Sequence, residues 1–561
     1  MNKKVLPLAV GAASAVVMSA AHAAMYVNER GTGETLIYPF YSAENGNNTL
    51  INIANTTGGH KAVKVRILEA QNSQEVLDFN LYLSPEDHFS FAVSETADGG
   101  AKLTTGDNSC TVPAIPEEGV EFRSLKYVAD KSADDADTAD VDESYDNTGI
   151  GRTQVGYIEV IEMGQLDADS PAVIDTAGIA STTVTAINAA AAITHDASGV
   201  PANCGILVDA WSTIAGVDGV WLAESKTAPL TGDSEFLANW AGGGLYGYAT
   251  VINVPQGASF GYDAVAISDH VAAGATGSDM HYQPGDIRPN FTDSALDMAA
   301  VVSVNGAATE VDFSGDYDGD AISRLQALNA TMMASEVYND YVTDTAIAAT
   351  TDWLMTFPTK AFHVSNGATE PVEPFSELWT GQSACEPTSL GAVDREESTP
   401  PPPPAPGSSG PDFSPKPPTP PGPAPSNNDV PLCYEATIVQ FAEETAMGSS
   451  TVAVGVNAFL DAANGWATIS MMPAAIDSTL DLCGTDGNST TTADQTDPCD
   501  RTITGDSGGA DVNMTGLPVV GFAVQKYVNG SANSAGALAN YGMSTEHKSC
   551  VAISGAIANE C

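Results

Sequence analysis

The stretch TLIYPFYSAENGNNTLINIANTTGGHKAVKVRILEAQNSQEVLDFNLYLSPEDHFSFAV (35–93) decides the fold. Apolar and aromatic residues alternate with polar ones in short runs, and Gly, Asn and Asp separate these runs. The pattern predicts strands at 35–42, 49–57, 62–70, 75–83 and 88–93, in an antiparallel sheet with one buried face. Their spacing of about ten residues is typical of a sandwich. We therefore expect an all-β fold, mainly antiparallel, with immunoglobulin-like sandwich elements, a few short helices and long loops.

The same alternation recurs along the rest of the chain. It predicts further strands at 155–163, 246–254, 351–364, 433–441, 465–471 and 517–530. Short helices are expected within 186–193, 205–214, 291–304 and 321–341, and a loop or short helix at 531–542. Trp211, Trp221 and Trp240 indicate pieces of chain that cover the sheet. No repeat at a fixed period is present, which argues against a solenoid or propeller.

The chain begins with the pattern of a secretory signal. Lys3 and Lys4 precede the short apolar run 6–18, and the small residues of AHA (21–23) form a cleavage site. This predicts a signal peptide at 1–23 and a secreted or cell-surface protein, with the periplasm as the alternative compartment. No later stretch is long and apolar enough to cross a bilayer as a helix.

A proline-rich stretch, STPPPPPAPGSSGPDFSPKPPTPPGPAPSNN (398–428), interrupts the strand patterns. Its composition favours an extended, polyproline-like segment. The stretch is either a linker between two domains or a loop within one domain, and Cys385 and Cys433 on its two sides favour the loop. The expected organisation is an N-terminal β-sandwich at 24–165, an Ala/Thr-rich covering region at 166–240, and a β-rich domain at 241–561 that contains this loop.

The eight cysteines suit an oxidising compartment and lack the spacing of a zinc ribbon or a thioredoxin motif. Pairing of neighbours along the chain is the simplest expectation, although about 105 connectivities are open. It predicts the disulfides Cys110–Cys204, Cys385–Cys433, Cys483–Cys499 and Cys550–Cys561.

The formal net charge is −51, from 20 Lys+Arg against 71 Asp+Glu. Such a surface repels nucleic acid and anionic lipid, which excludes nucleic acid as a partner. It stays hydrated in salt and attracts divalent cations. Two interpretations remain: a solvated surface suited to saline water, and a surface that cations bridge during assembly.

Calcium is the one cofactor that the acidic residues suggest. In DFSGDYDGD (312–320) the carboxylates of Asp316, Asp318 and Asp320 alternate, as ligands of a hard cation do. The stretch lacks the Gly and Glu that an EF-hand requires, so an acidic turn before a helix that Asp320 caps is the alternative. The acidic stretch 130–146 reads as a solvated loop, and 484–497 is a weaker cation candidate.

The pentapeptide GDSGG (505–509) resembles the nucleophile segment of chymotrypsin-like serine proteases, with Ser507 as the nucleophile. A protease also needs a histidine base and an aspartate that orients it. His363 and His547 lack the expected surroundings, and Cys499 is too far upstream. The histidines show no metal-ligand spacing. The sequence therefore predicts no catalytic residues.

Five blocks occur in order: 31–57, 61–87, 352–364, 432–441 and 516–542. Together they resemble a family of secreted proteins of Gram-negative proteobacteria that are labelled cell-surface proteins. The resemblance implies a β-rich extracellular protein and implies no catalytic residues. Some relatives have a shorter segment where the proline-rich stretch lies, which implies a loop inside one fold.

These observations predict a secreted, acidic, non-enzymatic structural protein of the cell surface, such as a subunit of a surface layer or an extracellular matrix. Its expected partner is itself, as a homo-oligomer or lattice, or a cell-surface glycan. The alternative function is a carbohydrate- or metal-binding adhesin, and a secreted hydrolase is the third.

Overall fold

A computed structural model describes residues 24–124, 149–170, 188–214, 216–225, 235–237, 242–272, 274–275, 280–304, 306–315, 317, 319–365, 371–394, 429–449, 451–460, 462–472, 501–531 and 538–553. The predictions for 1–23, 130–146, 398–428 and 484–497 lie outside these residues and stay predictions. No helix among the described residues is long and apolar enough to cross a membrane.

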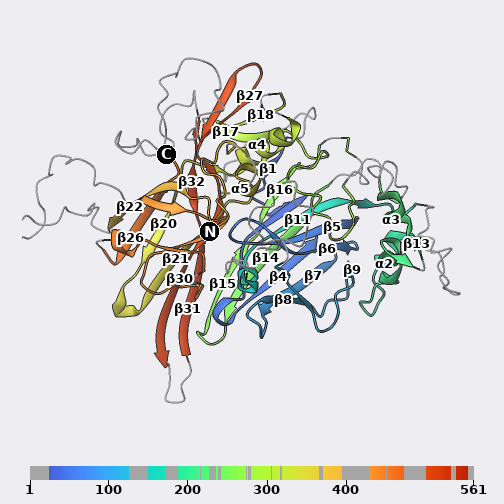
Figure 1. The fold of residues 1–561 in the computed structure, drawn as a ribbon, viewed down its shortest axis with the longest axis horizontal. Coiled ribbons are helices and arrows are strands. Elements are labelled where there is room, and N and C mark those ends of the chain that lie inside the picture. Colours follow the sequence, from blue (N-terminus) through green and yellow to red (C-terminus); the bar gives the residue numbers. More distant parts are fainter. Residues whose placement is uncertain are drawn as a thin grey trace, which may run out of the picture.

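Strands from the N-terminal half of the chain build two seven-stranded sheets, which we call sheet 1 and sheet 2 (Figure 1). In spatial order, sheet 1 contains β1 (Tyr26–Val27), β16 (Val265–Ser268), β3 (Thr35–Ser42), β11 (Val155–Leu166), β5 (His60–Glu69), β6 (Glu75–Leu83) and β9 (Cys110–Val112). Sheet 2 contains β10 (Val120–Glu121), β8 (Ala101–Thr104), β7 (His88–Glu95), β4 (Asn47–Asn55), β14 (Leu245–Asn253) and β15 (Ala258–Asp263), and β2 (Thr32–Gly33) pairs with β14.

The alternation that predicted these strands decides which side chains they bury. Leu36, Val65 and Val160 from sheet 1 meet Ile51, Phe91 and Val251 from sheet 2 in one core. Strands from both sides of residue 241 share these sheets, because β14 pairs with β4 and β16 pairs with β3. The domain boundaries expected from the sequence stay predictions.

The outer face of sheet 1 carries a cover of short helices: α1 (Ala189–Ile193), α2 (Cys204–Ala210) and α3 (Val220–Ser225). Trp211 and Trp221 pack against Tyr82 of β6; the Tyr82 and Trp221 rings are stacked, with centroids 5.8 Å apart. The disulfide Cys110–Cys204 joins β9 to α2. Between α2 and α3 lies the short pair β12 (Thr213–Ile214) and β13 (Val217–Asp218).

The C-terminal half contributes three five-stranded sheets. Sheet 3 contains β17 (Ala299–Val304), β18 (Ala307–Asp312), β27 (Thr502–Asp506), β28 (Asp511–Thr515) and β33 (Ala552–Ile553). Sheet 4 contains β23 (Asp429–Leu432), β22 (Glu386–Asp394), β26 (Asn464–Ser470), β20 (Glu336–Val342) and β32 (Lys548–Cys550). Sheet 5 contains β25 (Ala453–Gly455), β24 (Ala436–Gln440), β21 (Ala349–Thr356), β30 (Val520–Ser531) and β31 (Leu538–Glu546). The helices α4 (Asp320–Met332) and α5 (Lys360–His363) and the pair β19 (Met333–Ala334) and β29 (Leu517–Pro518) lie among them.

The central strands of sheet 5 are buried on both faces and connect the two halves of the molecule. Leu354 and Phe522 point into the core shared with sheets 1 and 2, and the Phe522 ring stacks on Tyr262 of β15 at 4.4 Å. Trp353 and Ala523, one position along each strand, point into the core shared with sheet 4. This double burial explains why the segments 353–355 and 522–524 are apolar at successive positions.

The proline-rich stretch connects two paired strands. β22 and β23 are antiparallel neighbours, with Glu386 opposite Leu432, and the disulfide Cys385–Cys433 lies one position beyond that pair. Both structural disulfides agree with the predicted neighbour pairing. Cys483, Cys499 and Cys561 lie outside the described residues, so their pairings stay predictions.

The fold is mostly antiparallel β with a few short helices, as the sequence predicts. Two local predictions are wrong. Residues 299–304, expected within a helical stretch, form β17, whereas the stretch 321–341 contains the expected helix as α4, followed by β20. Residues 538–546 form β31 in place of the expected loop or short helix, because they pair with β30 along most of their length. Pairing partners decide such cases against weak local propensity.

Candidate binding surfaces

Most of the charged side chains that the core encloses are paired, which assigns them a structural role. The Lys61 ammonium lies 2.5 Å from Glu162 on the inner face of sheet 1, and Arg66 lies 2.5 Å from Glu159 on the outer face. Burial raises the pKa of Glu159 and of Glu162 to about 7 despite these cationic partners. These pairs join β5 to β11, and groups paired in this way have little capacity for chemistry.

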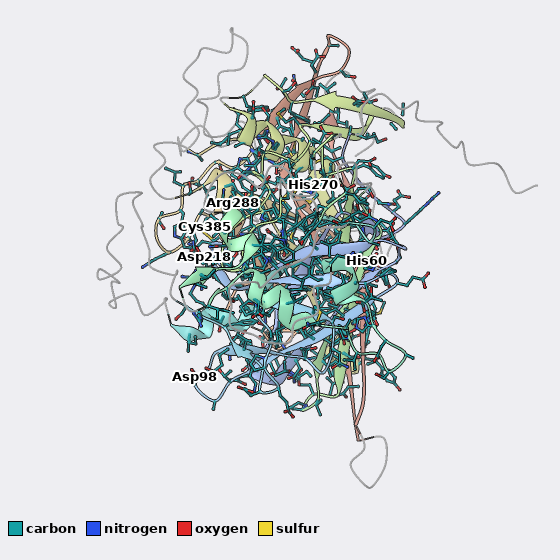
Figure 2. The ribbon with its side chains drawn as sticks, turned by 90° about the vertical axis from the view of Figure 1, so that its right-hand side faces the viewer. His60, Asp98, Asp218, His270, Arg288 and Cys385 are labelled. Atoms are coloured by element: carbon teal, nitrogen blue, oxygen red, sulfur yellow. A yellow bond between two sulfur atoms is a disulfide. The ribbon has the colours of Figure 1, made fainter. Side chains whose placement is uncertain are left out.

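The histidines are scattered, as the sequence indicates; His60 and His270 lie well apart in Figure 2. His281 is enclosed by Tyr82, Trp211, Trp221 and Phe236, and its Nε2 lies 2.9 Å from the Tyr82 hydroxyl. Burial lowers the pKa of His281 to about 3, so its ring is neutral in the folded protein. This cluster fixes the cover on the sheet.

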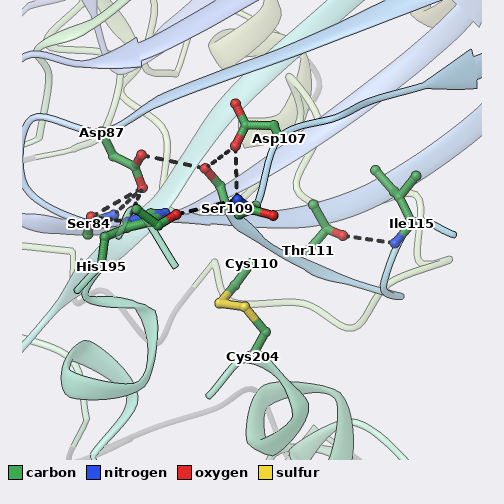
Figure 3. The surroundings of a disulfide bond; sticks show 11 residues. Ser84, Asp87, Asp107, Ser109, Cys110, Thr111, Ile115, His195 and Cys204 are labelled. Atoms are coloured by element: carbon green, nitrogen blue, oxygen red, sulfur yellow. Dashed lines mark hydrogen bonds and ion pairs between the residues drawn. A yellow bond between two sulfur atoms is a disulfide. The ribbon is translucent and has the colours of Figure 1, made fainter. Parts of the chain in front are cut away.

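A serine, a histidine and an aspartate meet beside the disulfide Cys110–Cys204 (Figure 3). Ser84 Oγ lies 3.0 Å from His195 Nδ1, and Asp87 Oδ2 lies 3.6 Å from the same nitrogen. A catalytic triad needs the serine and the aspartate on opposite ring nitrogens. This arrangement therefore links the cover to the loop after β6 and does not activate the serine.

The residues that the sequence singled out for chemistry do not come together. Ser507 lies in the turn between β27 and β28, where its amide donates to the Ala510 carbonyl at 2.9 Å. His363 is buried and lies 3.1 Å from the Asn329 amide nitrogen. His547 has both ring nitrogens engaged, by Asn339 and by the Leu354 carbonyl. The GDSGG motif is a hairpin turn here.

Of the proposed calcium ligands, Asp316 and Asp318 lie outside the described residues. Asp320 is exposed in the first turn of α4, and its carboxylate lies 3.9 Å from Arg324 one turn later. The N-cap is Gly319, so Asp320 does not cap the helix through its side chain. Within the described part of the chain, no group of three His, Cys, Asp or Glu side chains is arranged to hold a metal ion.

A cleft of about 890 Å³ opens where sheets 1 and 2 meet sheets 4 and 5. Its walls include Tyr262, Phe522, Met333, Thr545 and Glu546. Burial lowers the pKa of His547 in this wall to about 4, and its partners leave neither nitrogen free to act as a base. The cleft is a seam between sheets.

An uncharged hollow of about 500 Å³ lies on the outer face of sheet 2. Leu50, Asn52, Ser90, Thr104 and Tyr248 are among its lining residues, and none of the lining side chains is charged. Tyr248 is 38% exposed, with Tyr246 beside it at 6.0 Å between ring centroids. Hydroxyl and amide groups beside an aromatic ring suit a neutral polar ligand.

A second exposed sheet face carries the one exposed tryptophan among those described. Trp466 of β26 is 46% exposed, whereas Trp211, Trp221, Trp353 and Trp379 are buried. Tyr338 of the neighbouring β20 is 37% exposed. Tyr338 pairs with Thr468, two residues from Trp466, so both rings lie on the same face of sheet 4. We call Trp466, Tyr338, Thr468 and Gly391 the aromatic platform.

The third apolar surface belongs to β30 and β31, which we call the arm. In Figure 1 the two strands extend together toward the lower edge of the view. Tyr541 is 59% exposed and Met543 is 45% exposed, and Val528 is also exposed. Between Val520 and Thr545 the only charged residue is Lys526, whose ammonium is bound by Gln256 and the Thr445 carbonyl.

No family model, no curated protein and no solved structure matches this chain. The fold and its surfaces therefore define the class of protein: a multi-sheet antiparallel β protein with exposed aromatic and uncharged faces.

Proposed function

We propose that this chain is an extracellular structural protein that assembles with copies of itself into a surface layer or matrix. The observation that carries the proposal is the arm, whose only charged residues are Lys526 and the terminal Glu546, on a chain whose formal net charge is −51. Two copies repel each other over most of their surface, and the arm can meet a second arm without that repulsion. Burial of Tyr541 and Met543 then favours association, at about 25 cal/mol per Å² of apolar area.

The sandwich of sheets 1 and 2 belongs to the same proposal as an immunoglobulin-like element. Two antiparallel sheets on one core support this interpretation. Such sandwiches are rigid spacers, which suits a subunit that presents its contact surfaces at fixed positions.

Self-association of the mature full chain tests the proposal. Sedimentation velocity across a concentration series should show assemblies for the wild type and a shift toward monomer for Tyr541→Asp and Met543→Asp. Ile287→Asp is the matched control, because Ile287 is an equally exposed apolar residue outside the arm. A monomeric wild type at all concentrations, or arm variants that assemble like the wild type, would contradict the proposal.

Glycan binding is the second candidate function, because the hollow on sheet 2 is uncharged on an acidic protein. Saturable binding of a neutral polysaccharide that is lost in Tyr248→Ala, together with a monomeric wild type, would favour it.

A further inference from the structure

We propose that the aromatic platform of one copy binds the proline-rich stretch 398–428 of a second copy. The proposal rests on the proposed self-assembly and adds a second, chemically distinct contact to it.

The platform has the surface that recognises a polyproline helix. Its Trp466 and Tyr338 rings stand on adjacent strands, as diagonal neighbours about 7–8 Å apart at the backbone. Gly391 lies opposite Thr468 in the strand register. It is exposed and has no side chain, so the sheet surface beside the two rings is open to a ligand. Aromatic-lined surfaces bind proline-rich peptides because such peptides are extended before binding and lose little conformational entropy.

The occupant is present in the chain itself. The stretch contains the run Pro400–Pro404 and several Pro-x-x-Pro spacings, of which 415–418 and 418–421 are two. Its only charged residues are Asp412 and Lys416, so it carries no net charge. A copy with net charge −51 can therefore receive this stretch of another copy without the repulsion that its other surfaces exert.

The proposed self-assembly favours a second copy as the donor of the stretch. Gly391 pairs with Thr468 and Val393 pairs with Trp466, so β22 passes beside the platform and ends at Asp394. The chain returns as β23, which pairs with β22. Its own stretch is therefore the competing occupant, and the complementary pair of variants described below distinguishes the two.

Peptide binding tests the site directly. The synthetic peptide 398–428 contains no Trp and no Tyr, so the fluorescence of the exposed Trp466 can be used to detect peptide binding. The receptor is the full chain with 398–428 replaced by a Gly-Ser segment of equal length. We expect saturable protection of tryptophan emission from acrylamide by the peptide, and none by a version in which serine replaces every proline.

Substitutions on the receptor assign the site. Calorimetry should show peptide affinity reduced about tenfold or more in Trp466→Ala and in Tyr338→Ala, and unchanged in Ile287→Ala. Two separate variants guard against a fold defect in one of them, and the thermal unfolding midpoint checks both. Peptide binding that survives both substitutions, or its absence from the receptor, would overturn the proposal. So would protection of Trp466 by a neutral cello-oligosaccharide and not by the peptide.

A complementary pair tests the second copy separately from the arm. Both proteins carry Met543→Asp, which disables the arm. The first has 398–428 replaced by the Gly-Ser segment and so keeps the platform without the proline-rich stretch. The second carries Trp466→Ala and so keeps the stretch without an intact platform. The two should co-sediment as a mixed complex, whereas each alone should not associate through this contact. Peptide binding without a mixed complex assigns the platform to the chain's own stretch and overturns the second-copy proposal. Because the arm is disabled, failure here is distinct from failure of arm-mediated assembly.

Discussion

Buried carboxyl groups make stability depend on pH at the scale of single residues. Glu34 accepts hydrogen bonds from the amides of His270 and Val271. Burial, with a smaller contribution from Glu162 and Asp269, raises the pKa of Glu34 to about 8. The folded protein therefore holds this proton more tightly than the unfolded chain. The stability that Glu34 contributes is complete below about pH 4.5 and is lost as the pH rises through 8.

Glu34→Gln should remove this loss, because the amide oxygen still accepts both bonds and cannot ionise. We expect the free energy of unfolding of the variant, relative to the wild type, to rise by up to about 4 kcal/mol between pH 5 and pH 8, at about 1.4 kcal/mol per pKa unit. Urea unfolding at each pH measures it. Glu310→Gln, at an exposed position on β18, is the control and should follow the wild type. Parallel profiles for all three proteins would refute the assignment.

Individual residues also show which features of the surface and the core could not be predicted from the sequence. The sequence shows that GWATISM is a strand, so it places Trp466 on a sheet face. It does not show that Tyr338 and Gly391 flank that residue, because both arrive through strand register across long separations. The buried state of Glu34 and of His363 likewise depends on which elements pack over them, and neither residue carries a local signal of burial.

At the scale of elements, the strand predictions succeed where alternation is strong. The five runs within 35–93 match β3 to β7 within a few residues at each end. β31 was missed because Asn540 and Gly542, which have low strand propensity, interrupt the apolar residues of Leu538–Glu546. Its conformation depends on pairing with β30 and on close approach to β15: a Cβ on Gly542 would lie 2.4 Å from the Ser259 carbonyl oxygen.

The hairpin of β22 and β23 predicts that the proline-rich stretch adds little to stability. Replacing 398–428 by a short Gly-Ser loop should change the free energy of unfolding by about 1 kcal/mol or less, because loop closure depends weakly on length. The pair Cys385→Ala and Cys433→Ala should cost more, up to about 4 kcal/mol by the chain-entropy estimate for this loop.

Thermal and urea unfolding of both variants measure the two effects. Equal losses would show that the stretch itself stabilises the fold, contrary to its role as an appendage.

At the scale of the whole molecule, sheet 5 joins the two parts of the chain that the proline-rich stretch separates in the sequence. β21 pairs with β24 on one side and with β30 on the other, so chain from both sides of the proline-rich stretch forms one sheet. The arm, the aromatic platform and the hollow on sheet 2 are therefore attached to one connected body. A rigid body with separate contact surfaces is suited to build an ordered layer.

Imaging the surface of the producing cells by electron cryotomography, with and without the gene for this chain, tests whether the protein is a structural subunit of that surface. We expect a surface layer or matrix that disappears when the gene is deleted, returns with the wild-type chain, and does not return with Met543→Asp. An unchanged surface in the deletion strain would contradict the assignment of this protein as a structural subunit.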